Sequence, residues 1–243
     1  MQKKFSDVFK GKLTVIGMIH LAGKELSLDR ALDELAVYEQ EGVDAAIIEN
    51  YHGTKEQVEE VLSAAERMCR NIVLGVNILP NEYYISLPMA EHYGAKFVQL
   101  DHVAGRYTAG KIDHELYMDF KAKAPVIVLG GVWPKYYTPV SGSDLEKDLR
   151  EGMQRAEAVV VTGEATGKEI PIGKIRKFRE IIGDHPLVVG AGLTPENAYE
   201  QLMIADGAIV GSCFKPNGAT YGKVSAKLVK KFMSVVEKVR KEK

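Results

Sequence analysis

Polar side chains that can hold a proton or a substrate oxygen follow most of the apolar runs in this chain. His20, for example, directly follows the apolar stretch of residues 15–19. Carboxylates and imidazoles in such places can transfer protons, amides and hydroxyls can bind substrate oxygens, and a lysine can clamp an anion. The candidates are His20, Glu49, Asn50, Asn77, Asp101, Lys135 and Thr162.

Asp101 is the most specific candidate for proton transfer, with assistance from Glu49 or His20. Phe97, Gln99 and Asp101 alternate along one predicted strand, so they share a face, and we expect Gln99 and Asp101 to point into the interior. A carboxylate paired with a lysine or with backbone N–H groups is the structural alternative. A lone histidine at a strand end is also more often structural than catalytic, although its pKa suits proton transfer.

The remaining polar candidates are expected to bind substrate. Glu49 and Asn50 are neighbours on a predicted strand and point to opposite faces, so only one can face inward, and alternation alone does not decide which. We predict that Asn50, Asn77 and Thr162 hold substrate oxygens and that Lys135 clamps an anion.

Two apolar runs late in the chain end in glycine, and this pattern predicts a phosphate site. The first run leads into Gly190 and Gly192, and the second into Gly211 and Ser212. Glycine lets the backbone approach a ligand closely, and Thr194 is a predicted N-cap of the helix that follows the first run. In (β/α)8 barrels a phosphate often binds after the seventh and eighth strands. Tight turns without a ligand are the alternative.

The elements that must position these residues alternate regularly. Eight apolar runs begin near residues 13, 43, 72, 95, 125, 156, 186 and 205, and helical patterns lie between them, for example over residues 28–41 and 56–68. Continuous apolar strands separated by helices predict a parallel sheet covered by helices. The fold class is therefore α/β, a single (β/α)8 TIM barrel over residues 1–243. The irregular segments 103–113 and 132–143 follow strands and should lie over the site as lids.

Composition excludes several classes of function. The formal net charge of −1 gives no general affinity for nucleic acid, and no run reaches the length of a membrane span. Two cysteines, Cys69 and Cys213, are too few for a disulfide framework, so we expect a cytoplasmic protein. We expect no required cofactor, although Glu49, Asp101 and the asparagines could hold Mg²⁺. We also expect a homo-oligomer.

Several motifs resemble a known family. They are residues 15–21 (VIGMIHL), 42–50 (GVDAAIIEN), 75–77 (GVN), 161–167 (VTGEATG) and 205–212 (ADGAIVGS). Together these stretches, which run from the first strand to the eighth, resemble the BtpA/SgcQ family of predicted TIM-barrel proteins. Two departures lie at the expected site: the loop after His20 lacks the proline-rich insert of the family, and the fourth strand ends in Asp101 where an asparagine is expected.

The resemblance implies a barrel with a pocket, and two functions remain open. Some family members are associated with photosystem I biogenesis and others with sugar-utilisation gene sets. The first hypothesis is an enzyme that performs acid–base isomerase or lyase chemistry on a small phosphorylated metabolite, such as a sugar phosphate. The second is a non-catalytic assembly factor that uses the barrel as a binding platform. A phosphoribosylanthranilate-isomerase-like activity ranks lower, because the first strand has Gly17-Met18 where an acid–base cysteine is needed.

Overall fold

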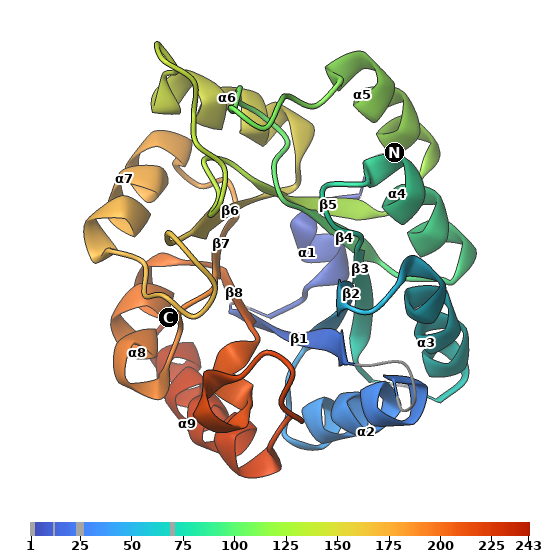
Figure 1. Ribbon diagram of the computed structural model, residues 1–243. Coiled ribbons are helices and arrows are strands. Elements are labelled where there is room, and N and C mark those ends of the chain that lie inside the picture. The colour runs from blue at the N-terminus through green and yellow to red at the C-terminus, as the bar shows by residue number, and fades with distance from the viewer. Residues whose placement is uncertain (1–2, 12, 23–26, 69–70) are drawn as a thin grey trace.

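Eight parallel strands close into a barrel in the order of the chain, which confirms the predicted TIM barrel (Figure 1). The computed structural model describes residues 3–11, 13–22, 27–68 and 71–243. Each strand begins within two residues of its predicted start. The strands are β1 (Thr14–Ala22), β2 (Ala45–His52), β3 (Val73–Asn77), β4 (Phe97–Leu100), β5 (Ile127–Gly131), β6 (Ala158–Thr162), β7 (Leu187–Gly190) and β8 (Gly207–Val210).

Helices surround the barrel on its outside (Figure 1). They are α2 (Ser27–Gln40), α3 (Lys55–Met68), α4 (Tyr83–His92), α5 (His114–Lys123), α6 (Leu145–Arg155), α7 (Ile172–Ile182), α8 (Pro195–Ile204) and α9 (Ala226–Glu242), with the 3-10 turns η1 (Ser212–Phe214) and η2 (Pro216–Gly218) before α9. The last helix begins at Ala226, directly after its N-cap residue Ser225.

A short first helix, α1 (Phe5–Val8), closes the amino-terminal end of the barrel and is visible through its centre in Figure 1. Phe5 and Phe9 belong to the same buried cluster as the inward side chains Ile16 and Phe97. The larger buried cluster lies between the strands and the outer helices. Apolar side chains therefore fill the amino-terminal end of the barrel interior, and the polar side chains lie at its carboxyl-terminal end.

Alternation along each strand explains where the polar side chains lie. Ile16 and Met18 on β1 belong to the interior cluster, and His20 is the next residue on the same face. On β2 the inward residues Ala45 and Ile47 are likewise followed by Glu49. The last inward residue of each strand thus reaches the carboxyl-terminal mouth of the barrel, where (β/α)8 enzymes carry out their chemistry.

The two long segments after β4 and β5 leave this same mouth and dock on one another. Tyr107 pairs with Gly110 and with Pro139, and the Thr108 N–H donates to the Thr138 carbonyl at 3.0 Å. The prediction that both segments lie on the side of the site is confirmed. Because each segment ties down the other, they cover one sector of the rim together.

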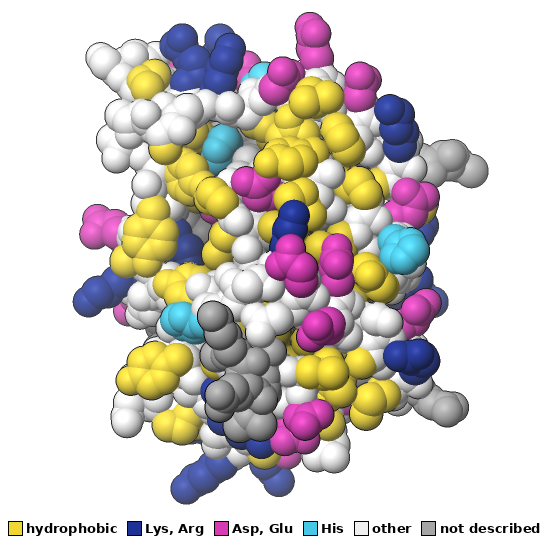
Figure 2. Space-filling model, turned by 45° about the vertical axis from the view of Figure 1, so that its right-hand side comes forward, with side chains coloured by type: hydrophobic (Ala, Val, Ile, Leu, Met, Phe, Trp, Pro, Cys, Tyr) yellow, Lys and Arg dark blue, Asp and Glu magenta, His cyan; other side chains and the backbone are white. Residues whose placement is uncertain are grey.

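No helix in the described ranges is both long and apolar enough to cross a membrane. Figure 2 shows one face of the molecule, on which acidic and basic side chains are interspersed with hydrophobic ones. Cys213 is a free, half-buried thiol, and Cys69 lies outside the described residues.

Candidate active site

Strand register brings three of the predicted polar residues side by side. In the parallel ladder His20 is paired with Glu49 between β1 and β2, and Glu49 is paired with Asn77 between β2 and β3. Paired residues of neighbouring parallel strands point to the same face, so all three side chains turn toward the barrel interior. The uncertainty between Glu49 and Asn50 is therefore resolved in favour of Glu49 as the inward residue.

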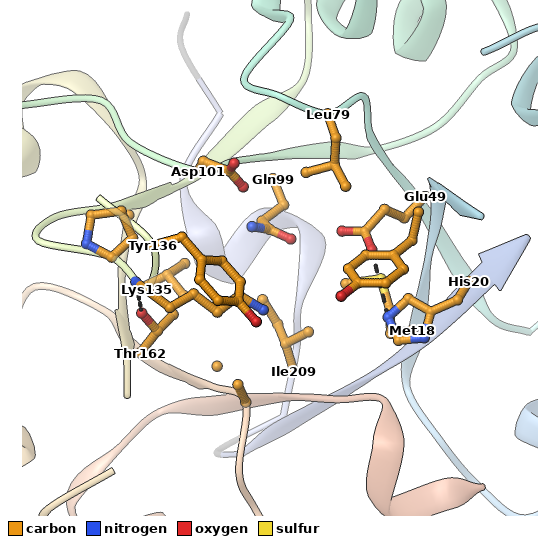
Figure 3. A pocket seen from close by; sticks show the side chains of 16 residues that line it. Met18, His20, Glu49, Leu79, Gln99, Asp101, Lys135, Tyr136, Thr162 and Ile209 are labelled. Carbon is orange, nitrogen blue, oxygen red and sulfur yellow. Dashed lines mark hydrogen bonds and ion pairs between the residues drawn. The ribbon is translucent and has the colours of Figure 1, made fainter. Parts of the chain in front are cut away.

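A cavity of about 120 Å³ occupies the mouth of the barrel. Figure 3 shows Glu49 and His20 on one side of it, Lys135 and Tyr136 on the other, and Asp101 with Gln99 between them. Its floor is apolar and includes Met18 and Ile209. Six of the predicted site residues line it, namely His20, Glu49, Asp101, Lys135, Thr162 and Gly190.

Glu49 is the most strongly perturbed carboxyl in this cavity. It is buried, and burial raises its pKa from 4.5 to about 7, against the opposing effect of the Lys135 ammonium. Asn77 donates from its side-chain amide to Glu49 Oε1 at 2.7 Å and to Gln99 Oε1 at 3.1 Å. A carboxyl whose pKa lies near neutrality can both take up and release a proton at physiological pH.

His20 lies between Glu49 and a buried lysine. Its Nε2 is 3.5 Å from Glu49 Oε2, and its Nδ1 is 2.9 Å from the Nζ of Lys215. Burial, together with the positive charge of Lys215, lowers the pKa of His20 well below its usual value. The imidazole is therefore neutral at physiological pH.

Asp101 stands just after β4 and faces the same cavity. The Tyr137 hydroxyl, from the segment after β5, donates to Asp101 Oδ2 at 3.0 Å. Burial raises the pKa of Asp101, and the hydrogen bond from Tyr137 acts in the opposite direction. Two carboxyls therefore share one cavity, and the charge of Asp101 contributes to the raised pKa of Glu49.

Lys135 and Thr162 connect the segments that follow β5 and β6. The Lys135 backbone N–H donates to Thr162 Oγ1 at 2.7 Å, and Lys135 Nζ donates to Thr166 Oγ1 at 3.0 Å. The Tyr136 hydroxyl contacts the same Thr166 oxygen at 3.2 Å. These bonds hold a cation at the cavity, across from Glu49.

Asn50 and Asn77 differ from the other predicted substrate-binding residues, because neither lines the cavity. Asn50 Oδ1 accepts a hydrogen bond from the Leu79 N–H at 2.7 Å, and its amide nitrogen is 3.4 Å from the Leu79 carbonyl. Asn77 is fully buried, with its amide directed to Glu49 and Gln99. We therefore assign Asn50 to the support of the loop after β3 and Asn77 to the placement of Glu49.

A second cavity of about 500 Å³ adjoins the first, between the segments that follow β6, β7 and β8. Ala191 lines the mouth cavity and the next residue, Gly192, lines this one. Of the predicted phosphate ligands, Gly192, Thr194 and Ser212 line the second cavity and Gly190 lines the first. The remaining predicted phosphate ligand, Gly211, lines neither cavity and directly precedes Ser212 in the chain.

The start of α8 is closed by its own side chains. The Thr194 N–H donates to Asn197 Oδ1 at 2.8 Å, Thr194 and Asn197 form a reciprocal capping box, and proline occupies the first turn. The Glu196 carboxylate also lines this cavity and pairs with Lys231 at 2.8 Å. Thr194 therefore uses its amide within the helix cap, and the backbone at Gly192, Gly211 and Ser212 is the better source of donors for an anion.

Among the described residues, no group of three or more His, Cys, Asp or Glu side chains could hold a metal ion. Glu49 and Asp101 supply two carboxyls to one cavity. A Mg²⁺ ion bound there with additional amide oxygens remains a prediction.

Tyr137 and Lys215 contact predicted site residues but were not among the sequence-based candidates. Tyr137 bonds to Asp101 from a segment with no regular pattern, and Lys215 bonds to His20 from the turn that follows η1. Neither residue stands at a strand end. The local sequence gives one sign that Lys215 is buried: the two residues before it, Cys213 and Phe214, are apolar.

A family model described as the BtpA family matches residues 12–238. The chain belongs to the BtpA family. An uncharacterized protein of Pyrococcus abyssi is 31% identical over 260 residues, covering 96% of this chain and 99% of that one. The Photosystem I biogenesis protein BtpA of Synechocystis is 26% identical, covering 84% of this chain and 81% of that protein. The sgc region protein SgcQ of Escherichia coli is 24% identical, covering 97% and 98%.

Solved structures confirm the barrel for this BtpA-family chain. The native KDPGal structure matches with a TM-score of 0.70 at 14% identity and covers 99% of this chain and 100% of that one. Phosphoribosyl anthranilate isomerase from Thermus thermophilus matches with a TM-score of 0.65 at 14% identity, covering 93% and 99%. At such identities the likeness shows the fold alone. Whether the chain forms a homo-oligomer stays a prediction.

Proposed function

We propose that this BtpA-family protein is an enzyme that acts on a small phosphorylated metabolite by acid–base isomerase or lyase chemistry. One observation carries the proposal: Glu49, a buried carboxyl with a pKa of about 7, lines a cavity at the carboxyl-terminal mouth of the barrel together with Asp101 and Lys135. A buried carboxyl is costly to a fold, so such a group in a cavity is a candidate for catalysis.

The proposed reaction begins with removal of a proton from the carbon next to a substrate carbonyl. Glu49 or Asp101, in its ionised form, accepts this proton. Negative charge then develops on the substrate oxygen, where the Lys135 ammonium and the imidazole of His20 are placed to stabilise it. Return of the proton to the former carbonyl carbon, with the neighbouring hydroxyl proton passing to the former carbonyl oxygen, completes an isomerisation. Loss of a protonated oxygen leaving group from the β-carbon, which breaks a carbon–oxygen bond, completes a lyase reaction instead.

The substrate is proposed to extend across both cavities. The mouth cavity, of about 120 Å³, takes the reacting end, and the second cavity, of about 500 Å³, takes the phosphate. Backbone N–H groups at Gly192, Gly211 and Ser212 and the Ser212 hydroxyl are the proposed phosphate ligands. Support for this placement comes from the general position of phosphate sites after strands 7 and 8 of such barrels.

A thermal-shift screen of phosphorylated sugars and related metabolites tests the proposal, with each phosphorylated compound paired with its dephosphorylated form. A ligand at 100 times its Kd stabilises the native state by about 2.7 kcal/mol, which raises the Tm of a protein of this size by about 5–10 °C. We expect stabilisation by phosphorylated members of the pairs. If no phosphorylated compound stabilises the protein, or if both members of each pair act equally, the proposed substrate class is wrong.

A second candidate function rests on the relative named Photosystem I biogenesis protein BtpA. A binding platform for assembly would use a surface of the barrel and would need no turnover. On this reading no metabolite stabilises the protein, and Glu49→Gln leaves its function intact. The polar, partly charged mouth cavity favours the enzyme, because a platform does not require buried carboxyls with raised pKa values.

A further inference from the structure

Lys215 is the most deeply buried lysine beside the site. Its side chain is 1% exposed, and it reaches His20 across 195 positions of the chain. In the described part of the chain its Nζ has two hydrogen-bond partners, both uncharged: the Thr220 carbonyl at 2.8 Å and His20 Nδ1 at 2.9 Å. Burying an ammonium group is costly, so its place beside a site histidine calls for an explanation.

The protonation state of Lys215 decides which atom of the contact donates. A lysine ammonium has three N–H donors and no acceptor. With Lys215 as an ammonium, the Thr220 carbonyl accepts one of these protons and His20 Nδ1 accepts another through its lone pair. A neutral imidazole carries one proton, so that proton is left on Nε2. Burial lowers the pKa of Lys215, but only to about 8, so the ammonium form is the main one at neutral pH.

The proton on Nε2 faces the mouth cavity. Nε2 is 3.5 Å from Glu49 Oε2, which is too long for a strong hydrogen bond and leaves this donor available to a ligand. The imidazole also lies against the Gly211 backbone, where an added Cβ would be 3.0 Å from His20 Cε1. If the ring turned over, Lys215 Nζ would face a ring carbon and this hydrogen bond would be lost, so the contact favours the observed orientation of the ring.

We propose that Lys215 is a positioning residue that holds His20 as the neutral tautomer protonated on Nε2, so that His20 donates a hydrogen bond to a substrate oxygen and does not accept a proton. The catalytic part rests on the proposed function, whereas the tautomer does not depend on any substrate. The assignment leaves Glu49 and Asp101 as the proton acceptors of the site.

Nitrogen-15 NMR of the histidine rings tests the proposal in the free protein. Long-range proton–nitrogen correlation spectra distinguish the two neutral tautomers and the imidazolium, and comparison with His20→Gln identifies the His20 signals among six histidines. The wild type should show His20 protonated on Nε2 alone. In Lys215→Met no ammonium donates to Nδ1, so the spectrum should show a mixture of the two neutral tautomers or the Nδ1-protonated form.

Lys174→Met is the matched control. Lys174 is a half-buried lysine at the same rim, but its Nζ donates to the carbonyls of Trp133 and Thr162, at 3.3 and 2.8 Å. This variant should leave the His20 tautomer unchanged.

A wild-type His20 that is protonated on Nδ1, or is an imidazolium, at neutral pH overturns the proposal even if Lys215→Met does not fold. An unchanged tautomer in folded Lys215→Met overturns it as well. Because no ligand is present in these spectra, the result is independent of the metabolite screen: a screen without hits would contradict the proposed enzyme and leave the tautomer assignment intact.

Discussion

Replacing Glu49 with glutamine should change how the stability of the protein depends on pH. Burial raises the pKa of Glu49 from 4.5 to about 7 in the folded protein, so the native state binds more protons than the unfolded chain between these two values. Stability contributed by the protonated carboxyl is therefore present below pH 4.5 and is lost as the pH rises through about 7. At 1.36 kcal/mol for each pH unit, the loss amounts to about 3 kcal/mol.

Glutamine keeps an oxygen that can accept the Asn77 hydrogen bond but does not titrate. The free energy of unfolding of the wild type minus that of Glu49→Gln should thus fall by about 3 kcal/mol between a pH below 4.5 and a pH above 7. Urea denaturation of both proteins across this pH range gives this difference in the free energy of unfolding. The titration of the other carboxyls contributes equally to both proteins and cancels. Glu60→Gln, on the exposed side of α3, controls for the loss of one negative charge. A difference that is flat, or that rises with pH, would refute a raised pKa at Glu49.

Three further substitutions probe the rim. Gly211→Val should weaken stabilisation by inorganic phosphate, because its Cβ would press on His20 and Met18 and shift the backbone N–H groups proposed to bind phosphate at Gly211 and Ser212; unchanged phosphate affinity would remove Gly211 from the proposed site. Gly192→Ala should destabilise the protein by about 2 kcal/mol more than Gly42→Ala in urea denaturation. Both glycines have a positive φ, but only at Gly192 does a Cβ meet backbone, 1.9 Å from the Lys168 carbonyl oxygen, and equal losses would contradict this reading. Asp101→Asn should lower turnover by about 10²–10⁴-fold and change substrate binding much less; retained activity would exclude Asp101 from proton transfer.

The barrel and its polar mouth could be predicted from the sequence because both follow from short-range regularities. Continuous apolar strands alternate with amphipathic helices at nearly constant spacing, and in such a barrel every strand ends at the same rim. His20, Glu49, Asp101 and Thr162 all line one cavity for this reason, although they lie on four different strands or strand ends.

It was harder to predict which polar residues face the cavity and which support the surrounding loops, because this depends on the register between neighbouring strands. A shift of one residue exchanges the two faces of a strand, and the local sequence around Glu49 and Asn50 contains no feature that selects either face. The ladder with β1 and β3 selects Glu49, and Asn50 then meets the backbone of Leu79. At Thr194 the sequence indicated a helix start correctly. In the capping box, the Asn197 side chain accepts the hydrogen bond of the Thr194 N–H. This N–H is then not free for an anion, so Thr194 is a weaker anion ligand than the start of an uncapped helix.

Lys215 shows the limit of local pattern reading most clearly. A search for polar residues at strand ends finds the side chains that point directly into the mouth cavity. Lys215 is not at a strand end: it lies in the turn between η1 and η2 and contacts the Nδ1 atom of His20. Its contact with His20 exists because β1 and β8 are neighbours when the barrel closes, which places residues 195 positions apart at hydrogen-bond distance. Barrel closure is a property of the whole chain. The residues that direct the proton of a site histidine can therefore be found in such a protein only after the strand order is known, even where the histidine itself is evident from its strand.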